Sequence, residues 1–275
     1  MAIAQSENAS ARPAGGATPR DRFQVRRIGD AELRESLAQG WADFLAKRGD
    51  LIVLGLVYPL VGFAAAFFFK GANLLQLLVP VAAGIALLGP VAAVGFYELA
   101  RRREDGLDSS WSHFLDVRKR PGWDSLFAVA NLLLAIFAAW VVVAALFWAA
   151  LIGDAPTSLS NLLALVFGTP EGWALIVIGN LVGLAFAMLV LALSVVSMPM
   201  LVDCDVDART ALDTSVRAVM ANKSVMLRWG LIVAALLVLG SIPAFVGLAV
   251  VLPVLGYATW HLYAHLVVRE DTRCD

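Results

Sequence analysis

Long apolar stretches alternate with short amphipathic segments along most of this chain. Six of the apolar stretches come close to or exceed the roughly 20 residues that a helix needs to cross a bilayer. They are residues 51–69, 74–100, 126–152, 173–202 and the two parts of 225–268. Gly240 to Pro243 is the expected break within the last run. The pattern predicts an all-α membrane protein whose six transmembrane helices form three hairpins.

A short amphipathic segment precedes each hairpin. The first begins near Asp30, the second surrounds Trp111, and the third covers residues 208–221. A helix with one apolar face beside a membrane span is expected to lie in the headgroup plane. The apolar face of the first segment consists of Leu33, Leu37, Trp41 and Phe44 or Leu45. We therefore predict three cytoplasmic interfacial helices, and the expected membrane anchors are Trp41, Trp111, Leu212 and Val216.

Three prolines occupy equivalent places in this pattern. Pro90, Pro199 and Pro253 each lie in the second half of the second span of a hairpin. Together with the amphipathic segments they indicate an internal repeat of one interfacial helix and one hairpin. Coincidence is the alternative, because proline is commoner in membrane helices than in soluble ones.

The basic residues assign the two sides of the membrane. Of the 21 Lys and Arg residues, only Lys70 falls on the side opposite to the others. By the positive-inside rule both termini belong in the cytoplasm. Residues 153–171 contain no Lys or Arg, and the apolar piece 159–167 is too short to cross. This piece is predicted to be a periplasmic interfacial or re-entrant segment.

Composition agrees with a membrane protein. Hydrophobic residues make up 60% of the chain and charged residues 16%, whereas soluble domains carry about 25% charged residues. The first 25 residues are rich in Ala, Ser, Gly, Pro and Arg and lack the apolar core of a signal peptide. We expect a disordered cytoplasmic tail at 1–25, with an organellar transit peptide as the alternative, then a membrane domain at 26–268 and a second cytoplasmic tail at 269–275.

The two cysteines, Cys204 and Cys274, both fall on the side assigned to the cytoplasm. Cytoplasmic thiols are normally kept reduced. We therefore expect free thiols at both positions.

Ionisable residues recur eight positions after the repeat prolines, at Glu98, Asp207 and His261, and Asp203 lies close by. If the repeats pack around a pseudo-threefold axis, these side chains would converge at the cytoplasmic mouth. Clustered ionisable groups in a membrane protein are candidates for function. The alternative is that charges are simply tolerated at helix ends.

No sequence motif of catalysis or metal binding occurs in the chain. His261 and His265 are spaced i, i+4, but two histidines are fewer than a zinc site needs, and a polar interfacial rim is the favoured interpretation. The chain lacks Walker A, G-x-S-x-G, H-E-x-x-H, C-x-x-C and G-x-G-x-x-G motifs. We expect a non-enzyme with no catalytic residue, metal or cofactor.

Two stretches carry a resemblance to a known family. Residues 197–203, Ser-Met-Pro-Met-Leu-Val-Asp, and residues 252–263, which end in Ala-Thr-Trp-His-Leu-Tyr, resemble the bacterial integral membrane family of domain of unknown function 2189. The likeness runs from about residue 26 to 268. The family pattern usually has His where this chain has Tyr257, so no role that needs that His carries over.

Some members of that family have been labelled cytochrome c oxidase proteins. A catalytic haem-copper core needs about six histidines as ligands, and this chain has three. The resemblance therefore implies an accessory or assembly role beside a respiratory complex.

Together these observations predict a non-enzymatic accessory, assembly or scaffold protein of a bacterial inner membrane. Its expected partners are the lipid bilayer and a membrane protein, and no nucleic acid; the oligomeric state is left open. The alternative is a small-solute transporter or channel built from the internal repeats.

Overall fold

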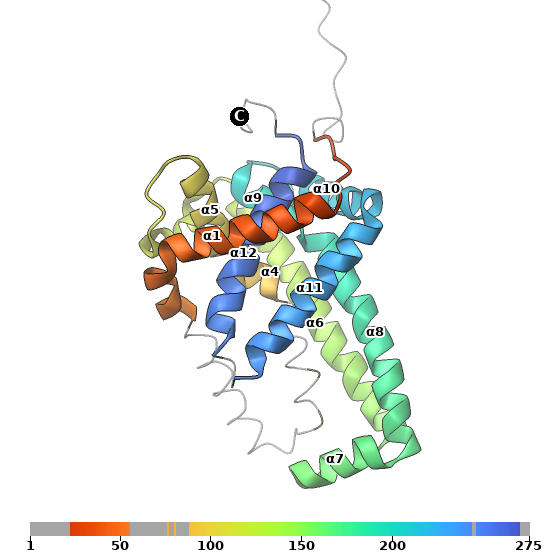
Figure 1. Ribbon diagram of the computed structural model, residues 1–275. Helices are drawn as coiled ribbons and strands as arrows, with labels where there is room; N and C mark the ends of the chain where they lie inside the picture. The colour runs from red at the N-terminus through yellow and green to blue at the C-terminus, as the bar shows by residue number, and fades with distance from the viewer. Residues whose placement is uncertain (1–22, 56–75, 77–79, 81–87, 244–245, 270–275) are drawn as a thin grey trace, which may run out of the picture.

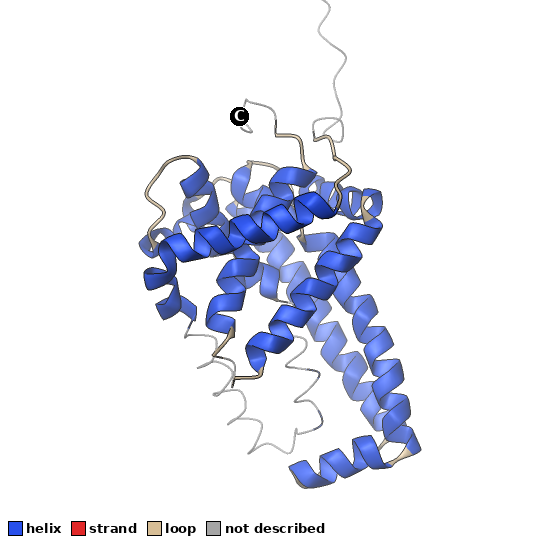
Figure 2. Cartoon of the chain, viewed as in Figure 1, coloured by secondary structure: helices blue, strands red, loops and turns tan. Residues whose placement is uncertain are grey.

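The computed structural model describes residues 23–55, 76, 80, 88–243 and 246–269. Within these ranges the chain is helical and contains no strand beyond an isolated bridge between Val25 and Val267 (Figure 2). The all-α prediction is confirmed for them. The helices are α1 (Asp30–Gly55), α4 (Gly89–Ala92), α5 (Val94–Glu104), the 3-10 helices η2 (Trp111–His113) and η3 (Asp116–Lys119), α6 (Trp123–Leu151), α7 (Leu159–Gly168), α8 (Pro170–Ser194), α9 (Ser197–Asp203), α10 (Ala208–Ala221), α11 (Lys223–Ser241) and α12 (Leu248–Leu266).

A long hairpin of α6 and α8 projects from the rest of the molecule, and α7 lies across its far end (Figure 1). Three described helices are long and apolar enough to cross a membrane, namely Trp123–Leu151, Pro170–Asp203 and Lys223–Ser241. They are α6, α8 continued by α9, and α11. The predicted third, fourth and fifth spans are thereby confirmed as membrane-spanning candidates.

The full six-span, three-hairpin arrangement stays a prediction. Residues 56–69 of the first expected span, and residues 74–75, 77–79 and 81–87 of the second, lie outside the described residues. The expected sixth span corresponds to α12, which follows a break at the expected Gly240 to Pro243 turn. This helix is not among the three spanning candidates, and much of it is buried inside the protein.

One end of the molecule holds most of the described ion pairs. We call it the charged end and define it as residues 30–43, 94–120, 203–217 and 257–269. Helix α12 is central there, since it packs against α1, α5, α9 and α11. The bulkiest fully buried side chains are Trp229, Trp260, Tyr97, Tyr257 and Tyr263. The core around these aromatic residues is mainly aliphatic.

The three amphipathic segments pack on three different helices. Helix α1 lies along α12, the η2–η3 segment lies against α5, and α10 lies against α9. The contact of α1 with α12 is close because residue 40 is glycine. A Cβ at Gly40 would be only 2.6 Å from the Ala258 backbone nitrogen. Likewise the Phe114 ring covers Gly95 of α5.

The structure corrects the prediction for α1 in two respects. The helix continues without a break to Gly55, so the first interfacial helix and the start of the first expected span are one helix. Leu33 and Phe44 of the expected membrane face are buried inside the protein, together with Ser36 and Gly40, whereas Trp41 is exposed. The cause is α12, which packs along this buried face of α1 and leaves Trp41 and Leu45 exposed.

The second amphipathic segment is not an α-helix. It consists of the two short 3-10 helices η2 and η3. Pro121 and Gly122 follow directly and limit extension of the helix. Phe114 packs on α5 and Val117 is buried, which is the i, i+3 spacing that a 3-10 helix aligns.

Residues ahead of α1 are attached to the C-terminal half of the chain. The Arg26 N–H donates to the Leu266 carbonyl at 2.8 Å. The Asn222 amide accepts from the Ile28 N–H and donates to the Arg26 carbonyl. Of the predicted tails at 1–25 and 269–275, residues 1–22 and 270–275 lie outside the described residues.

Cys204, the C-cap of α9, is disulfide-bonded. The expectation of a free thiol is wrong at this position. Cys274 lies outside the described residues.

Candidate functional site

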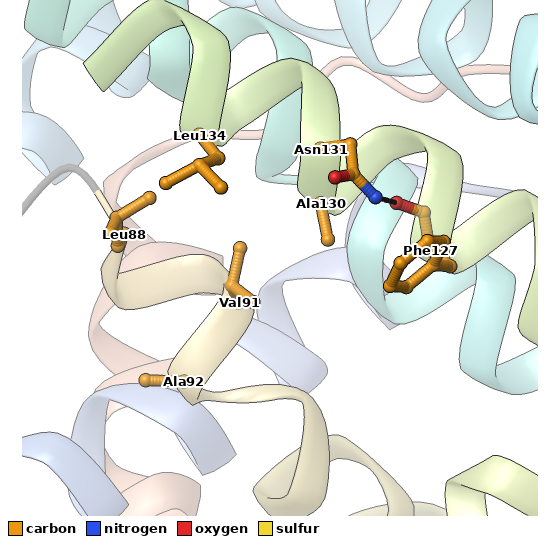
Figure 3. A pocket seen from close by; sticks show the side chains of 7 residues that line it. All are labelled: Leu88, Val91, Ala92, Phe127, Ala130, Asn131 and Leu134. Atoms are coloured by element: carbon orange, nitrogen blue, oxygen red, sulfur yellow. Dashed lines mark hydrogen bonds between the residues drawn. The ribbon is translucent and has the colours of Figure 1, made fainter. Parts of the chain in front are cut away.

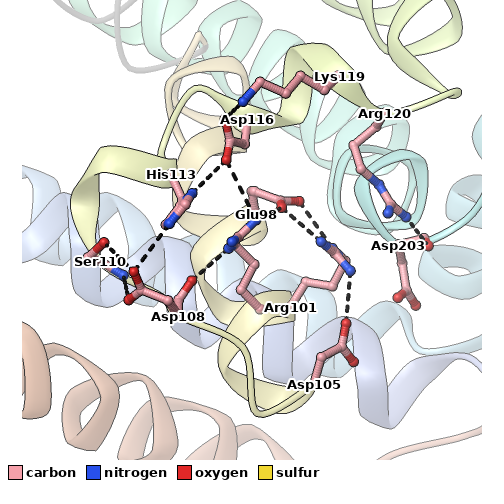
Figure 4. A network of polar contacts seen from close by, with 11 residues as sticks. Glu98, Arg101, Asp105, Asp108, Ser110, His113, Asp116, Lys119, Arg120 and Asp203 are labelled. Carbon is pink, nitrogen blue, oxygen red and sulfur yellow. Dashed lines mark hydrogen bonds and ion pairs between the residues drawn. The ribbon is translucent and has the colours of Figure 1, made fainter.

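Glu98 is buried on α5 with 1% of its surface exposed. Its carboxylate accepts two hydrogen bonds from the Arg101 guanidinium, at 2.8 and 3.1 Å, and lies 3.7 Å from Arg102 (Figure 4). Arg101 also pairs with Asp105 at 2.8 Å. A buried carboxylate is tolerated when it is paired and hydrogen-bonded in this way. Glu98 is therefore engaged within its own helix.

Asp203 is the last residue of α9 and joins it to α12. Its carboxylate accepts a hydrogen bond from the Tyr263 hydroxyl at 2.9 Å and lies 3.7 Å from Arg269. Arg269 pairs with Glu104 of α5 at 2.8 Å, and its guanidinium stacks over the rings of Trp260 and Tyr263. These contacts join the ends of α5, α9 and α12.

His261 of α12 reaches α1 rather than Glu98 or Asp207. Its Nε2 lies 2.7 Å from a carboxylate oxygen of Asp43. The other oxygen of Asp43 lies 3.1 Å from Nε of Arg103. The buried Asp43 carboxylate thus connects α1, α5 and α12 at one point.

Asp207 has a local structural role. It is exposed and is the N-cap of α10, where its side chain accepts from the Thr210 N–H at 3.3 Å. A carboxylate is among the preferred groups at such a position.

The four predicted site residues lie at the same end of the molecule but not against one another. Among the described residues no ion pair or hydrogen bond joins any two of Glu98, Asp203, Asp207 and His261. Each instead has its own partner. Their role as a functional cluster stays a prediction.

A second polar cluster, which the sequence analysis did not single out, surrounds His113. Its two ring nitrogens lie 2.6 Å from Asp116 and 3.2 Å from Asp108 (Figure 4). A hydrogen bond from Lys119, helped by His113, lowers the pKa of Asp116 to about 2. The Ser110 N–H and hydroxyl lower the pKa of Asp108. The i, i+3 spacing of His113, Asp116 and Lys119 was the available signal in the sequence.

The four expected membrane anchors fall into two pairs. Trp41 and Trp111 expose about half of their surface, at 48% and 51%. Leu212 and Val216 are only half-buried, because α10 turns another face to its neighbours. The buried residues of that face are Ala211, Thr214, Ser215, Ala218 and Val219.

A hydrogen bond of Ser215 explains which face of α10 is turned toward the neighbouring helices. Its hydroxyl accepts a hydrogen bond from the Val196 N–H at 3.2 Å. Val196 lies where the chain breaks between α8 and α9, so its N–H lacks a partner within the helix. A buried N–H needs such a partner.

A pocket lies between α4 and α6 (Figure 3), and Val91, Ala92 and Phe127 are among its lining residues. Its polar lining residue is Asn131, whose amide nitrogen donates to the Phe127 carbonyl at 2.8 Å. The lining of the pocket is therefore largely apolar. Across the described ranges, no group of three or more His, Cys, Asp or Glu side chains could hold a metal ion.

Comparison with known proteins supports one statement about family. The family model described as "Predicted integral membrane protein (DUF2189)" matches residues 78–203. The resemblance seen in the sequence is confirmed over that range, which ends at Asp203. No curated protein and no solved structure matches the chain.

Proposed function

We propose that this integral membrane protein is a non-enzymatic accessory or scaffold protein of a bacterial inner-membrane complex, with a respiratory complex as the favoured partner. One observation carries the proposal: the buried ionisable side chains of the charged end are occupied by contacts within the chain. Glu98, Asp203 and Asp43 all have cationic or hydroxyl partners. A carrier or catalyst needs ionisable groups that can exchange partners, whereas a scaffold needs a rigid surface.

The surface that would meet a partner is the outward side of the η2–η3 segment. Trp111 and Leu115 expose just over half of their surface, and Arg118 beside them is exposed. Exposed aromatic and aliphatic groups beside an arginine are typical of protein interfaces. Lys119, in contrast, is paired with Asp116 at 2.6 Å.

The predicted internal repeat is the feature that supports the transporter alternative. The segments that contain or follow the repeat prolines, α5, α9 and α12, pack against one another. Each amphipathic segment packs on the proline-associated helix that precedes it in the chain, and α1 completes the cycle by packing on α12. This cyclic packing supports a repeat, and repeats are common in transporters.

The first test is recovery of a partner from membranes in mild detergent, with the full chain as bait and mass spectrometry as the readout. We expect Leu115→Ala combined with Arg118→Ala to lower recovery of a stoichiometric membrane protein at least about fivefold, because interface anchors contribute roughly 1 kcal/mol or more each. The control is Leu163→Ala on α7, where the side chain is similarly exposed at the opposite end.

Flux measurements in proteoliposomes separate the two functions. Asp207→Asn removes a charge and keeps an N-cap residue, so folding is preserved. Glu98→Gln is less suitable, because it would leave the Arg101 guanidinium underpaired in a buried site. If the protein is a scaffold, solute flux stays at background for the natural chain and for the Asp207→Asn variant. If the natural chain shows saturable solute flux and Asp207→Asn abolishes it, the protein is a transporter and not a scaffold.

A further inference from the structure

The outward face of α8 carries a regular uncharged stripe that the described residues leave uncovered. It consists of Trp173, Val177, Asn180, Leu184 and Ala187, all exposed. Their spacing alternates between four and three residues, which is the repeat of a helix seam that meets a second helix in left-handed packing. The hydrocarbon of the bilayer is its default surrounding, since this helix is a spanning candidate.

Asn180 is a polar residue in this apolar surrounding. It lies seven residues after Trp173, about 10 Å along the helix, and so inside the apolar part of the span. Its amide nitrogen donates to the Ile176 carbonyl at 2.7 Å. A carboxamide has two donor hydrogens and an acceptor oxygen, and the described residues supply no partner for that oxygen or for the second N–H. Unpaired polar groups are costly where water is absent.

We propose that α8 associates with α8 of a second copy of this chain, with the two Asn180 amides hydrogen-bonded across a twofold axis. An amide is both donor and acceptor, so the same residue in a second copy is complementary to it by symmetry. Asparagine side chains associate membrane helices in this manner. Residues 172–202 contain no charged side chain, so this face of α8 does not need an oppositely charged partner.

Ala187 is the small residue of the stripe and permits close approach of the two helices. The exposed stripe begins at Trp173, whose indole N–H donates to the Phe167 carbonyl of α7. The η2–η3 segment lies at the other end of the hairpin (Figure 1). A twofold contact through this half of α8 leaves the charged end free. The inference therefore does not rest on the proposed scaffold function.

The chain contains a matched control for Asn180. Asn131 of α6 is also exposed and also donates its amide to a carbonyl four residues earlier, at 2.8 Å. It lies in the apolar pocket of Figure 3 and not on the α8 stripe. If local bonding alone satisfied such an amide in the membrane, replacement of either asparagine would have the same effect.

The test is energy transfer between donor-labelled and acceptor-labelled full chains in proteoliposomes, recorded over a range of protein-to-lipid ratios. We expect the natural chain to reach a two-copy plateau. Asn180→Leu should raise the protein density at half-association by about threefold to tenfold, the range seen for interhelical hydrogen bonds in membranes. Asn131→Leu should leave it unchanged.

A steric pair of variants tests the face independently of the amide. Ala187→Trp should prevent association, whereas Ala185→Trp, on the same helix but turned away from the stripe, should not. Thermal unfolding of each variant verifies that it is folded. A natural chain that stays monomeric at every density, equal effects of Asn180→Leu and Asn131→Leu, or equal effects of the two tryptophans would each overturn the proposal.

Discussion

At the scale of single residues, polar and small side chains in this protein connect helices that are far apart in sequence. Asp43 and His261 are 218 positions apart and lie 2.7 Å from each other. Asn222 fixes the segment before α1 through its side-chain amide. In a membrane protein the apolar side chains gain little by leaving lipid for protein, so small and polar residues select the helix contacts.

Gly40 offers a test of this principle. Gly40→Ala should destabilise the protein by about 1 to 3 kcal/mol, because the new Cβ would lie 2.6 Å from the Ala258 nitrogen and overpacking costs that much. The measurement is the thermal unfolding midpoint in detergent, which should fall by several degrees.

The control for that substitution is Gly179→Ala. No atom lies within 4 Å of the place that its Cβ would take, and alanine favours a helix over glycine by up to about 1 kcal/mol. Its unfolding midpoint should stay the same or rise. A Gly40→Ala midpoint at or above that of the natural chain would show that α1 does not pack closely on α12.

At the scale of helices, periodicity predicted the boundaries of several helices closely. The third amphipathic helix was expected at residues 208–221 and is α10, Ala208–Ala221. The span expected at 126–152 is α6, Trp123–Leu151. Boundaries are predictable here because they depend on local features, such as a capping Asp207 and the change from polar to apolar residues.

The orientation of each helix was harder to predict. The apolar stripe of α1 was expected to face the membrane, yet Leu33 and Phe44 of this stripe are buried in the protein, while Trp41 is exposed. Hydrophobic periodicity identifies the two faces of a helix but not which of them meets protein, because lipid accepts an apolar face as well as a protein core does. For the same reason nothing local in the sequence indicated that His261 pairs with Asp43.

The outward face of α1 yields a prediction about membrane depth. Trp41 should lie among the lipid headgroups, because its ring is exposed beside the exposed Ala42 and Leu45 on a helix whose other face is taken by α12. Trp41→Phe in vesicles of brominated lipid should remove a fluorescence component that bromines near the headgroups quench most strongly.

Trp229→Phe is the control, since Trp229 is buried with 1% exposed and its emission should escape quenching at any bromine depth. A Trp41 component that is quenched best by bromines near the bilayer centre, or not at all, would contradict the interfacial position of α1.

At the scale of the whole molecule, charge and shape point to the same orientation in the membrane. The described basic residues gather at the charged end, where α6 and α11 begin. Helix α7 lies at the opposite end of the α6–α8 hairpin (Figure 1), in the 153–171 stretch that has no Lys or Arg. By the positive-inside rule we therefore expect this segment on the periplasmic side.

Topology reporters test that orientation directly. Reporters placed after Arg120 and after Lys223 should give a cytoplasmic signal, because both sites adjoin the charged end. A reporter at Ser160 of α7 should give a periplasmic signal, because α6 separates the two ends by 29 helical residues, about 43 Å, more than the hydrocarbon thickness of about 30 Å. A cytoplasmic signal at Ser160 would mean that the hairpin does not cross the bilayer, and the headgroup position of Trp41 would lose its basis with it.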